Sequence, residues 1–177
     1  MTTIAEHDQY LSERTGCYEY REVRYSAAAS KLLAIGLTER STVYDIGAGM
    51  TEFDYHLRSA HGWRGRYIPI DGSIDGTDLN TWYPPRIATH AVALELLEHL
   101  YEPRRLVDVL QAKMTSSVVV SVPNPRTVDV LGIDPTHVSI ITAEMLETWG
   151  FRVEERTFYG GVLSNGEPDA LLGVWRP

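Results

Sequence analysis

From residue 26 onward, apolar positions fall alternately into continuous runs and helix-like spacings. The continuous runs are rich in valine and isoleucine, which is typical of strands buried on both faces of a sheet. They predict strands at 42–46, 66–70, 88–94 and 117–122. Apolar residues three and four positions apart predict helices at 4–14, 26–35, 51–60 and 103–114.

The order of elements changes in the last part of the chain. Thr142 can cap a helix that ends at Gly150, and strands at 151–158 and 170–175 follow it. Alternating strands and helices followed by a hairpin predict a mostly parallel sheet with one antiparallel strand near the C-terminus. The expected fold class is therefore α/β, with a three-layer, doubly wound, Rossmann-like sheet.

The strand at 66–70 contains Pro69, which has no amide hydrogen to donate. Such a strand should lie at or near a sheet edge. The stretch that follows it, 72–87, contains Pro84 and Pro85 and is too short for a full helix and a full strand. The usual third strand and the helix before it are therefore expected to be shortened or missing.

Length and composition predict one globular domain over 1–177, because the chain has 177 residues of which 44% are apolar. The sequence contains no apolar run long enough to span a membrane, and its first residues lack the pattern of a secretory signal. Its single cysteine, Cys17, cannot form an internal disulfide, so a reducing, cytoplasmic location is expected.

The net charge of −8 gives little attraction to nucleic acid or to an anionic membrane surface. A local basic patch could oppose this average. The two candidate pairs are Arg21 with Arg24 and Arg104 with Arg105, and both are interpreted as solvated helix faces.

The strand at 42–46 runs directly into a glycine turn, in which Gly47 and Gly49 allow a sharp bend without Cβ clashes. Asp45 lies near the end of this strand, and Asp71 follows the next one. In doubly wound sheets, ligands bind beyond the carboxyl ends of the strands. These residues are therefore candidates for a nucleoside-binding crevice.

The chain resembles the class I S-adenosylmethionine-dependent methyltransferases over most of its length. The resemblance rests on the order and spacing of several segments: Asp45 to Gly49, Asp71, Asp78 to Asn80, Glu95 to His99, Val120 to Pro125, and Thr142 to Phe151. One departure is Thr51, which stands where the family has a third glycine and which could instead cap the next helix.

The resemblance implies that S-adenosylmethionine is the cofactor. It implies that Asp71 accepts hydrogen bonds from the ribose and Asp78 from the adenine amino group, with Leu79 packing near the ring. The full implied cofactor set is Asp45, Gly47, Ala48, Gly49, Asp71, Gly72, Asp78, Leu79 and Glu95. Two alternatives stay open: Asp71 can be a strand-end turn former, and Asp78 an ordinary loop acid.

A Glu-x-x-Glu-His segment supplies Glu95, Glu98 and His99, which share one face if the segment forms a helical turn. With His137 as a fourth ligand, they could hold Mg²⁺, Mn²⁺ or Zn²⁺. The pattern is similar to that of metal-dependent O-methyltransferases of ubiquinone biosynthesis and of 2′-O-methyltransferases acting on small-RNA ends. Without a metal, His99 or His137 is the best candidate for a general base.

These observations favour an enzyme that methylates an oxygen, less readily a nitrogen, of a small molecule. The alternatives are methylation of a nucleotide or nucleic-acid end, and a degenerate methyltransferase fold that acts as a binding subunit. Residues 1–40 are expected to form a helical lid over a core at 41–177, and Tyr25 to contribute to the pocket floor. The oligomeric state is not indicated by the sequence.

Overall fold

The structure is a computed structural model that describes residues 18–177, so the predicted helix at 4–14 lies outside the described residues. Its strands are β1 (Thr42–Ile46), β2 (Arg66–Ile70), β3 (Ala88–Leu94), β4 (Met114–Pro123), β5 (Arg152–Arg156) and β6 (Ala170–Trp175). Its helices are α2 (Tyr18–Ile35), α3 (Glu52–His61), α4 (Gly72–Asp75), α5 (Pro103–Lys113), α6 (Val130–Ile133) and α7 (Ala143–Thr148), with the 3₁₀ turn η1 (Leu97–His99). Within the described residues the other predicted elements are present, but α2 begins earlier, β4 is longer at both ends and β5 is shorter than expected.

The strands form one six-stranded sheet in the order β2-β1-β3-β4-β6-β5. Strands β1 to β4 are parallel, whereas β6 runs antiparallel to both β4 and β5. This confirms the predicted mostly parallel sheet. The carboxyl ends of β1 to β4 therefore meet along one side of the sheet, where the candidate site residues follow.

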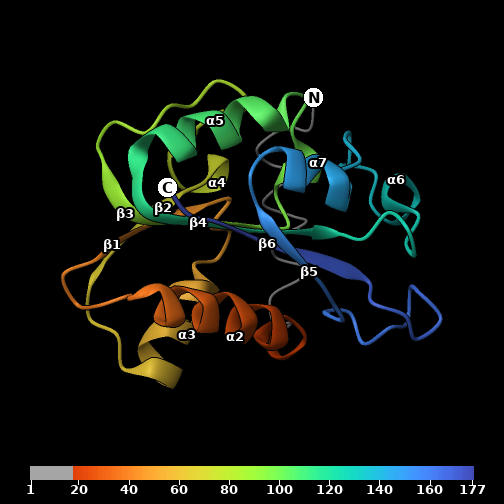
Figure 1. Cartoon of the computed structure of the whole chain (residues 1–177), viewed down its shortest axis with the longest axis horizontal. Coiled ribbons are helices and arrows are strands. Elements are labelled where there is room, and N and C mark those ends of the chain that lie inside the picture. The colour runs from red at the N-terminus through yellow and green to blue at the C-terminus, as the bar shows by residue number, and fades with distance from the viewer. Residues whose placement is uncertain (1–17) are drawn as a thin grey trace.

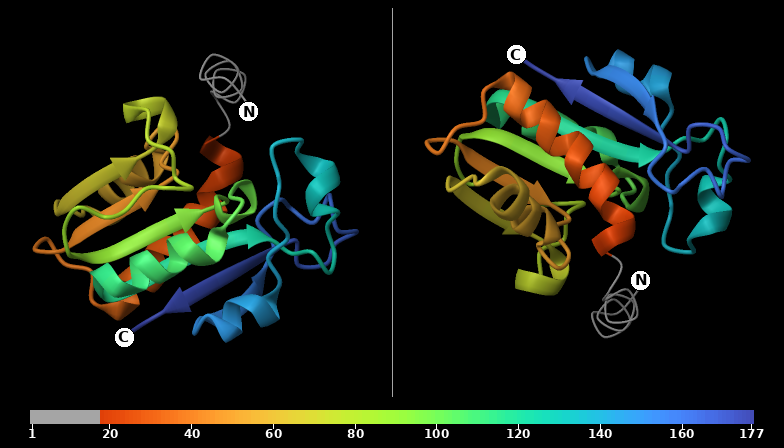
Figure 2. Two further views of the ribbon diagram at one scale, coloured as in Figure 1. Left: turned by 90° about the horizontal axis from the view of Figure 1, so that it is seen from above. Right: turned by 90° about the horizontal axis from the view of Figure 1, so that it is seen from below.

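Helices cover both faces of the sheet: α5 and α7 lie on one side, and α2 and α3 on the other (Figures 1 and 2). The alternation of side chains along the strands divides the core accordingly. In β1, Tyr44 and Ile46 pack into the core on the α5 side, while Val43 packs with Leu32 and Phe53 beneath α2 and α3. Each central strand is thus buried on both faces, which explains its continuous apolar run.

Strand β2 lies at one edge of the sheet, as Pro69 predicts. The amide of Arg66 donates to Ser41 and the carbonyl of Ile70 accepts from Gly47, so alternate residues beginning at Arg66 face β1. Pro69 therefore faces the open edge, where its missing amide protects that edge from pairing. Between α4 and β3, residues 76–87 contain no helix or strand.

Among the helices described for residues 18–177, none combines the length and the apolar character needed to cross a lipid bilayer.

Candidate functional site

The glycine turn joins β1 to α3 at the carboxyl end of the sheet. Gly47 and Gly49 have φ angles of 73° and 49°, and the amide of Gly47 donates to the carbonyl of Ile70 at 2.8 Å. Thr51 also adopts a left-handed conformation, with φ 58°, directly before α3. Thr51 occupies the N-cap position of α3, as the sequence suggested, but its side chain makes no capping hydrogen bond.

Asp71 lies beside the glycine turn and is buried. Its Oδ2 accepts from the amide of Gly49 at 2.9 Å, and its Oδ1 accepts from the amide and hydroxyl of Ser73 at 2.9 and 2.7 Å. The carboxylate therefore joins the glycine turn to the first turn of α4, which begins at Gly72. Carboxylate oxygens accept hydrogen bonds, which is the chemistry that binding of a sugar hydroxyl requires.

The two predicted adenine contacts, Asp78 and Leu79, lie in the segment after α4. Asp78 is exposed and accepts from the backbone and side-chain amides of Asn80. Leu79 is half-buried and packs against the core on the α5 side. The structure brings neither residue into a contact that distinguishes an adenine site from an ordinary loop.

Asp45 is only 4% exposed and points toward the α2 side of the sheet, where it accepts a hydrogen bond from the hydroxyl of Tyr67. Burial raises the pKa of Asp45 to about 7, and the charge of Asp71 acts in the same direction. The Tyr67 hydrogen bond opposes this rise.

Glu95 follows β3 with a φ of 54°, an unusual angle for a residue other than glycine. Its carboxylate accepts from the Ser121 hydroxyl at 2.7 Å and from the Tyr159 hydroxyl. The Nη1 atom of Arg24 lies 3.9 Å from Oε2 of Glu95. Burial raises the pKa of Glu95, and Arg24 opposes that rise.

Glu98, His99 and His137 form a compact cluster of potential ligands, with one ligand atom of each lying within 4.8 Å of the others. The carbonyl of Glu98 accepts from the amides of Val138 and Ser139 at 2.8 and 3.0 Å, which brings His137 next to η1. Glu95 is not a member of this cluster. The predicted set of four ligands is therefore corrected to three. Glu95 has a left-handed backbone conformation, and its carboxylate is hydrogen-bonded to Ser121 and Tyr159 instead of joining the cluster.

Glu98 is 1% exposed, and neither oxygen of its carboxylate has a hydrogen-bond partner within residues 18–177. Nε2 of His137 lies 4.0 Å from Oε1. Burial raises the pKa of Glu98 well above its ordinary value, and the nearby charge of Glu95 adds to the rise. A buried carboxyl group with both oxygens unpartnered is costly, and a cation would satisfy both oxygens.

Hydrogen bonds at Nδ1 orient the imidazole rings of His99 and His137. Thr136 Oγ1 donates to Asp134 Oδ1 at 2.6 Å and lies 2.9 Å from His99 Nδ1, so His99 Nδ1 is the donor of that bond. His137 Nδ1 lies 2.6 Å from the carbonyl of Val130 and must donate to it. In the neutral rings, Nε2 of both residues then carries the lone pair, which is the state that a metal ligand or a base requires.

Two functional candidates were missed by sequence reasoning, Arg24 and Tyr159. The prediction that Arg21 and Arg24 form a solvated face is wrong: Arg21 donates to Glu52 at 2.7 Å, and the Arg24 side chain is 11% exposed beside Glu95. Tyr159 reaches Glu95 from the segment between β5 and β6. No local pattern in the sequence signals either contact, because each joins segments far apart in the chain.

The other predicted basic pair and Tyr25 have structural partners. Arg104 pairs with Asp108 on the helix surface, whereas Arg105 donates to the carbonyls of Thr81 and Trp82. Tyr25 is buried and donates to Glu52 at 2.8 Å, and burial raises the pKa of its hydroxyl to about 12.

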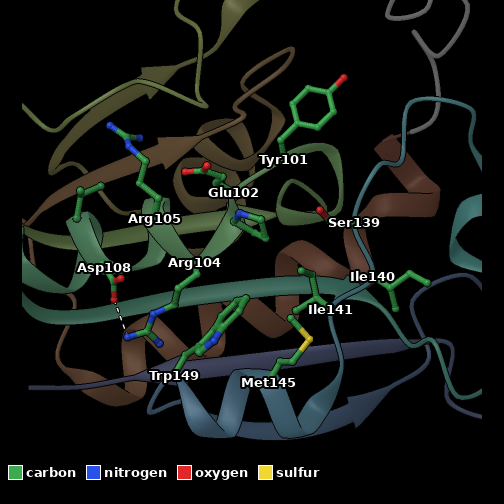
Figure 3. Close-up of a pocket in the computed structure, with 12 residues that line it drawn as sticks. Tyr101, Glu102, Arg104, Arg105, Asp108, Ser139, Ile140, Ile141, Met145 and Trp149 are labelled. Atoms are coloured by element: carbon green, nitrogen blue, oxygen red, sulfur yellow. Dashed lines mark ion pairs between the residues drawn. The ribbon is translucent and has the colours of Figure 1, made fainter.

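A hollow of about 690 Å³ lies elsewhere, between the start of α5 and α7 (Figure 3). Arg104 stacks over Trp149 there, with Met145 and Ile141 lining the pocket beside them (Figure 3). None of the predicted site residues lines it, so it is distinct from the candidate site at the strand ends.

Comparison of the sequence with protein-family models and with curated proteins finds no match. Comparison with solved structures finds similar folds at low identity. One is in the complex between the Haloferax volcanii Trm112 methyltransferase activator and a partner chain described as a methyltransferase. It has a TM-score of 0.70 and 15% identity, and the match covers 97% of this chain and 96% of that one.

Two other structures point to the same fold. The plantazolicin methyltransferase BpumL in complex with S-adenosylhomocysteine has a TM-score of 0.62 and 13% identity, over 95% of this chain and 87% of that one. An S-adenosylmethionine-dependent methyltransferase from Mesorhizobium loti has a TM-score of 0.61 and 17% identity, over 86% and 100%. At these identities the likeness establishes a fold and not an activity: the chain has the Rossmann-like fold of the S-adenosylmethionine-dependent methyltransferases.

Proposed function

We propose that the chain is an S-adenosylmethionine-dependent methyltransferase that acts on a hydroxyl oxygen of a small molecule. The observation that carries the proposal is the cluster of Glu98, His99 and His137. The cluster follows β3 and β4, whereas the glycine turn and Asp71 follow β1 and β2. All four strands are parallel, so these residues come after strand ends on the same side of the sheet. Ligands of doubly wound sheets bind at this side, so donor and acceptor would meet there.

The donor would lie over the glycine turn. The sharp turn at Gly47, Ala48 and Gly49 gives its methionine part close access to backbone, because two of the three residues have no Cβ. Asp71, followed by Gly72, would accept from the ribose hydroxyls, and Asp78 with Leu79 would border the adenine. Glu95 would face the amino-acid end, while Asp45 would support the turn from the α2 side of the sheet.

In the transfer step, a lone pair of the acceptor oxygen attacks the methyl carbon of the sulfonium. The carbon–sulfur bond breaks, and its electron pair stays on sulfur, which becomes a neutral thioether. The acceptor proton must leave, and Nε2 of His99 or His137 would take it, since Nδ1 of each ring is bonded on its other side. The chain's task is otherwise to hold the acceptor in line with the bond that breaks.

A divalent cation fits the same three residues. The donor set is one carboxylate and two imidazoles, and the unpartnered Glu98 oxygens would gain a ligand. Nitrogen and oxygen ligands of this kind suit Mn²⁺ or Zn²⁺, and Mg²⁺ less well because of the histidines. A bound cation would supply a lower pKa and a fixed orientation to the acceptor hydroxyl.

The test is a methyl-transfer screen with labelled S-adenosylmethionine and small molecules that carry hydroxyl or amine groups, run with and without a chelator. Transfer that depends on a hydroxyl and is lost with chelator supports the full proposal. Transfer that is unaffected by chelator would rule out the cation and leave the two imidazoles as the candidate bases. Calorimetric titration that detects no affinity for S-adenosylmethionine or S-adenosylhomocysteine overturns the enzyme proposal.

A further inference from the structure

The hollow between α5 and α7 has the size and the lining of a small-molecule site. Its volume is about 690 Å³, and such sites in proteins enclose about 300–1,000 Å³. Helix α5 contributes Pro103 and Val109 to the lining, and the segment that contains α7 contributes Ile141, Met145 and Trp149 (Figure 3). Predominantly apolar walls with few polar groups are typical of sites for small molecules.

Three of the lining side chains favour an aromatic partner. The Cζ atom of Arg104 lies 5.6 Å from the ring centre of Trp149, so a cation and a ring already stack at this position (Figure 3). An indole ring also packs well against a second ring, and a guanidinium is attracted to aromatic faces. The sulfur of Met145 makes favourable contacts with ring edges. These groups give the hollow a preference for a flat ring over a saturated one.

The charges around the hollow offset one another. Two arginines and two carboxylates line it, so neither sign is in excess. Arg104 pairs with Asp108 at 2.6 Å, and Arg105 donates to the two backbone carbonyls of residues 81–82. Glu102, the second carboxylate, is exposed to solvent. A charged ligand would lose hydration here and meet no excess of opposite charge, whereas an uncharged ligand avoids that cost.

The wall of the hollow is continuous with the segments that carry the cluster of Glu98, His99 and His137. Tyr101, at the rim, lies two residues after His99. Ser139, also in the lining, lies two residues after His137, and its hydroxyl donates to the carbonyl of Leu100 at 2.6 Å. A molecule in the hollow would therefore contact both segments that hold the imidazoles.

We propose that this hollow binds a small, uncharged molecule that carries an aromatic ring. The proposal goes beyond the proposed function and does not depend on it, because the glycine turn, Asp71 and the cluster do not line the hollow. Concave shape and volume indicate a free small molecule as the occupant.

The experiment compares 2-naphthol with decahydro-2-naphthol, which have the same ring skeleton and hydroxyl but differ in aromaticity. Backbone amide NMR spectra of the full chain, titrated with each compound, give the dissociation constant and locate the compound on the chain. The titration is repeated on Trp149→Ala and on the matched control Tyr83→Ala. Tyr83 is also an aromatic residue, 51% exposed, but it stacks with Lys113 outside the hollow.

A loss of folding in Trp149→Ala would not end the test. If thermal unfolding shows that this variant does not fold, Trp149→Leu replaces it, because leucine keeps apolar bulk at the position and removes the aromatic ring. The comparison with Tyr83→Ala then stays the same.

In the wild type, 2-naphthol is expected to shift the amide signals of lining residues such as Ser139 and Met145. Decahydro-2-naphthol should bind about 3- to 10-fold more weakly, because it lacks the aromatic contacts. Trp149→Ala should weaken 2-naphthol about 10-fold, and Tyr83→Ala should leave its affinity unchanged.

Three results would each overturn the proposal. The first is that 2-naphthol shifts no lining residue, or shifts signals scattered over the surface, which would show adsorption without a site. The second is equal affinity for the two compounds. The third is wild-type affinity in the folded variant at Trp149. The titration contains no methyl donor, so a failure of the proposed function would leave its outcome unaffected.

Discussion

Thr136 holds the ring of His99 through a hydrogen bond of 2.9 Å between its Oγ1 and the imidazole Nδ1. Because the same hydroxyl donates to Asp134, it can only accept from His99. The hydrogen bonds from His99 to Thr136 and from Thr136 to Asp134 therefore decide that Nδ1 carries the hydrogen in the neutral ring, which puts the lone pair on Nε2, the atom that would bind a cation or a proton.

Thr136→Val should weaken the binding of Mn²⁺ or Zn²⁺ about 10- to 100-fold, because it removes the group that orients a ligand histidine. Thr136→Ser keeps the hydroxyl and should retain the wild-type affinity. Calorimetric titration of the metal into each protein provides the measurement. Equal affinity in the valine and serine variants would show that His99 is not a ligand or that its orientation does not depend on Thr136.

Glu98→Gln should abolish metal-dependent stabilisation. A ligand that binds only the native state raises the unfolding temperature, and Glu98 is the one carboxylate of the three-residue cluster. The wild type should therefore unfold at a higher temperature with Mn²⁺ or Zn²⁺ than with chelator, and Glu98→Gln should show no such difference. Glu102→Gln, at an exposed glutamate nearby, serves as the control and should behave as the wild type. A metal-induced rise in Glu98→Gln that matches the wild type would contradict the assignment.

Asp45 makes stability depend on pH. Its pKa is raised from 3.8 to about 7 in the folded chain, chiefly by burial and despite the Tyr67 hydrogen bond; Asp71 and Asp54 add to the rise, and Arg24 opposes it. The native state therefore binds more protons than the unfolded state between about pH 4 and pH 7. The stability that this group contributes is present below about pH 4 and is lost as pH rises through about 7.

Asp45→Asn should reduce the decline in unfolding free energy across this range of pH. Urea unfolding at several pH values between about 4 and 8 measures the slope for wild type and variant. Asp108→Asn makes the same chemical change at an exposed carboxylate, and it should keep the wild-type dependence of unfolding free energy on pH. A slope that is the same in Asp45→Asn and in the wild type would show that the carboxyl is not protonated near neutral pH.

The strands could be predicted because their information is local. Four of them, β1, β2, β3 and β6, begin and end at the predicted residues, since each is a run of apolar residues bounded by polar or turn-forming ones. The edge position of β2 was also readable, because Pro69 removes a donor wherever it lies. A single residue type carried that inference.

The side-chain partners at the site were less predictable because they join distant segments. Spacing alone placed Glu95 with Glu98 and His99, but Ser121 and Tyr159 bind the Glu95 carboxylate, the latter from 64 residues away. Two arginines on a helix likewise suggest a solvated face, and only the packing of α2 against the rest of the chain shows that they are half-buried. The cluster of Glu98 with His137 was found because both follow strand ends on the same side of the sheet.

Asp71→Ala should weaken the binding of S-adenosylhomocysteine by about 1–3 kcal/mol, because it removes an acceptor of hydrogen bonds from the ribose. Adenosine should weaken similarly, since it has the same sugar. The carboxylate also holds Gly49 and Ser73, so a control must separate ligand contact from turn geometry. Ser73→Ala provides it: this variant removes the hydroxyl that donates to Asp71 at 2.7 Å and leaves the carboxylate in place. Calorimetry should find near-wild-type affinity in Ser73→Ala, and an unaltered dissociation constant in Asp71→Ala would mean that the sugar binds elsewhere.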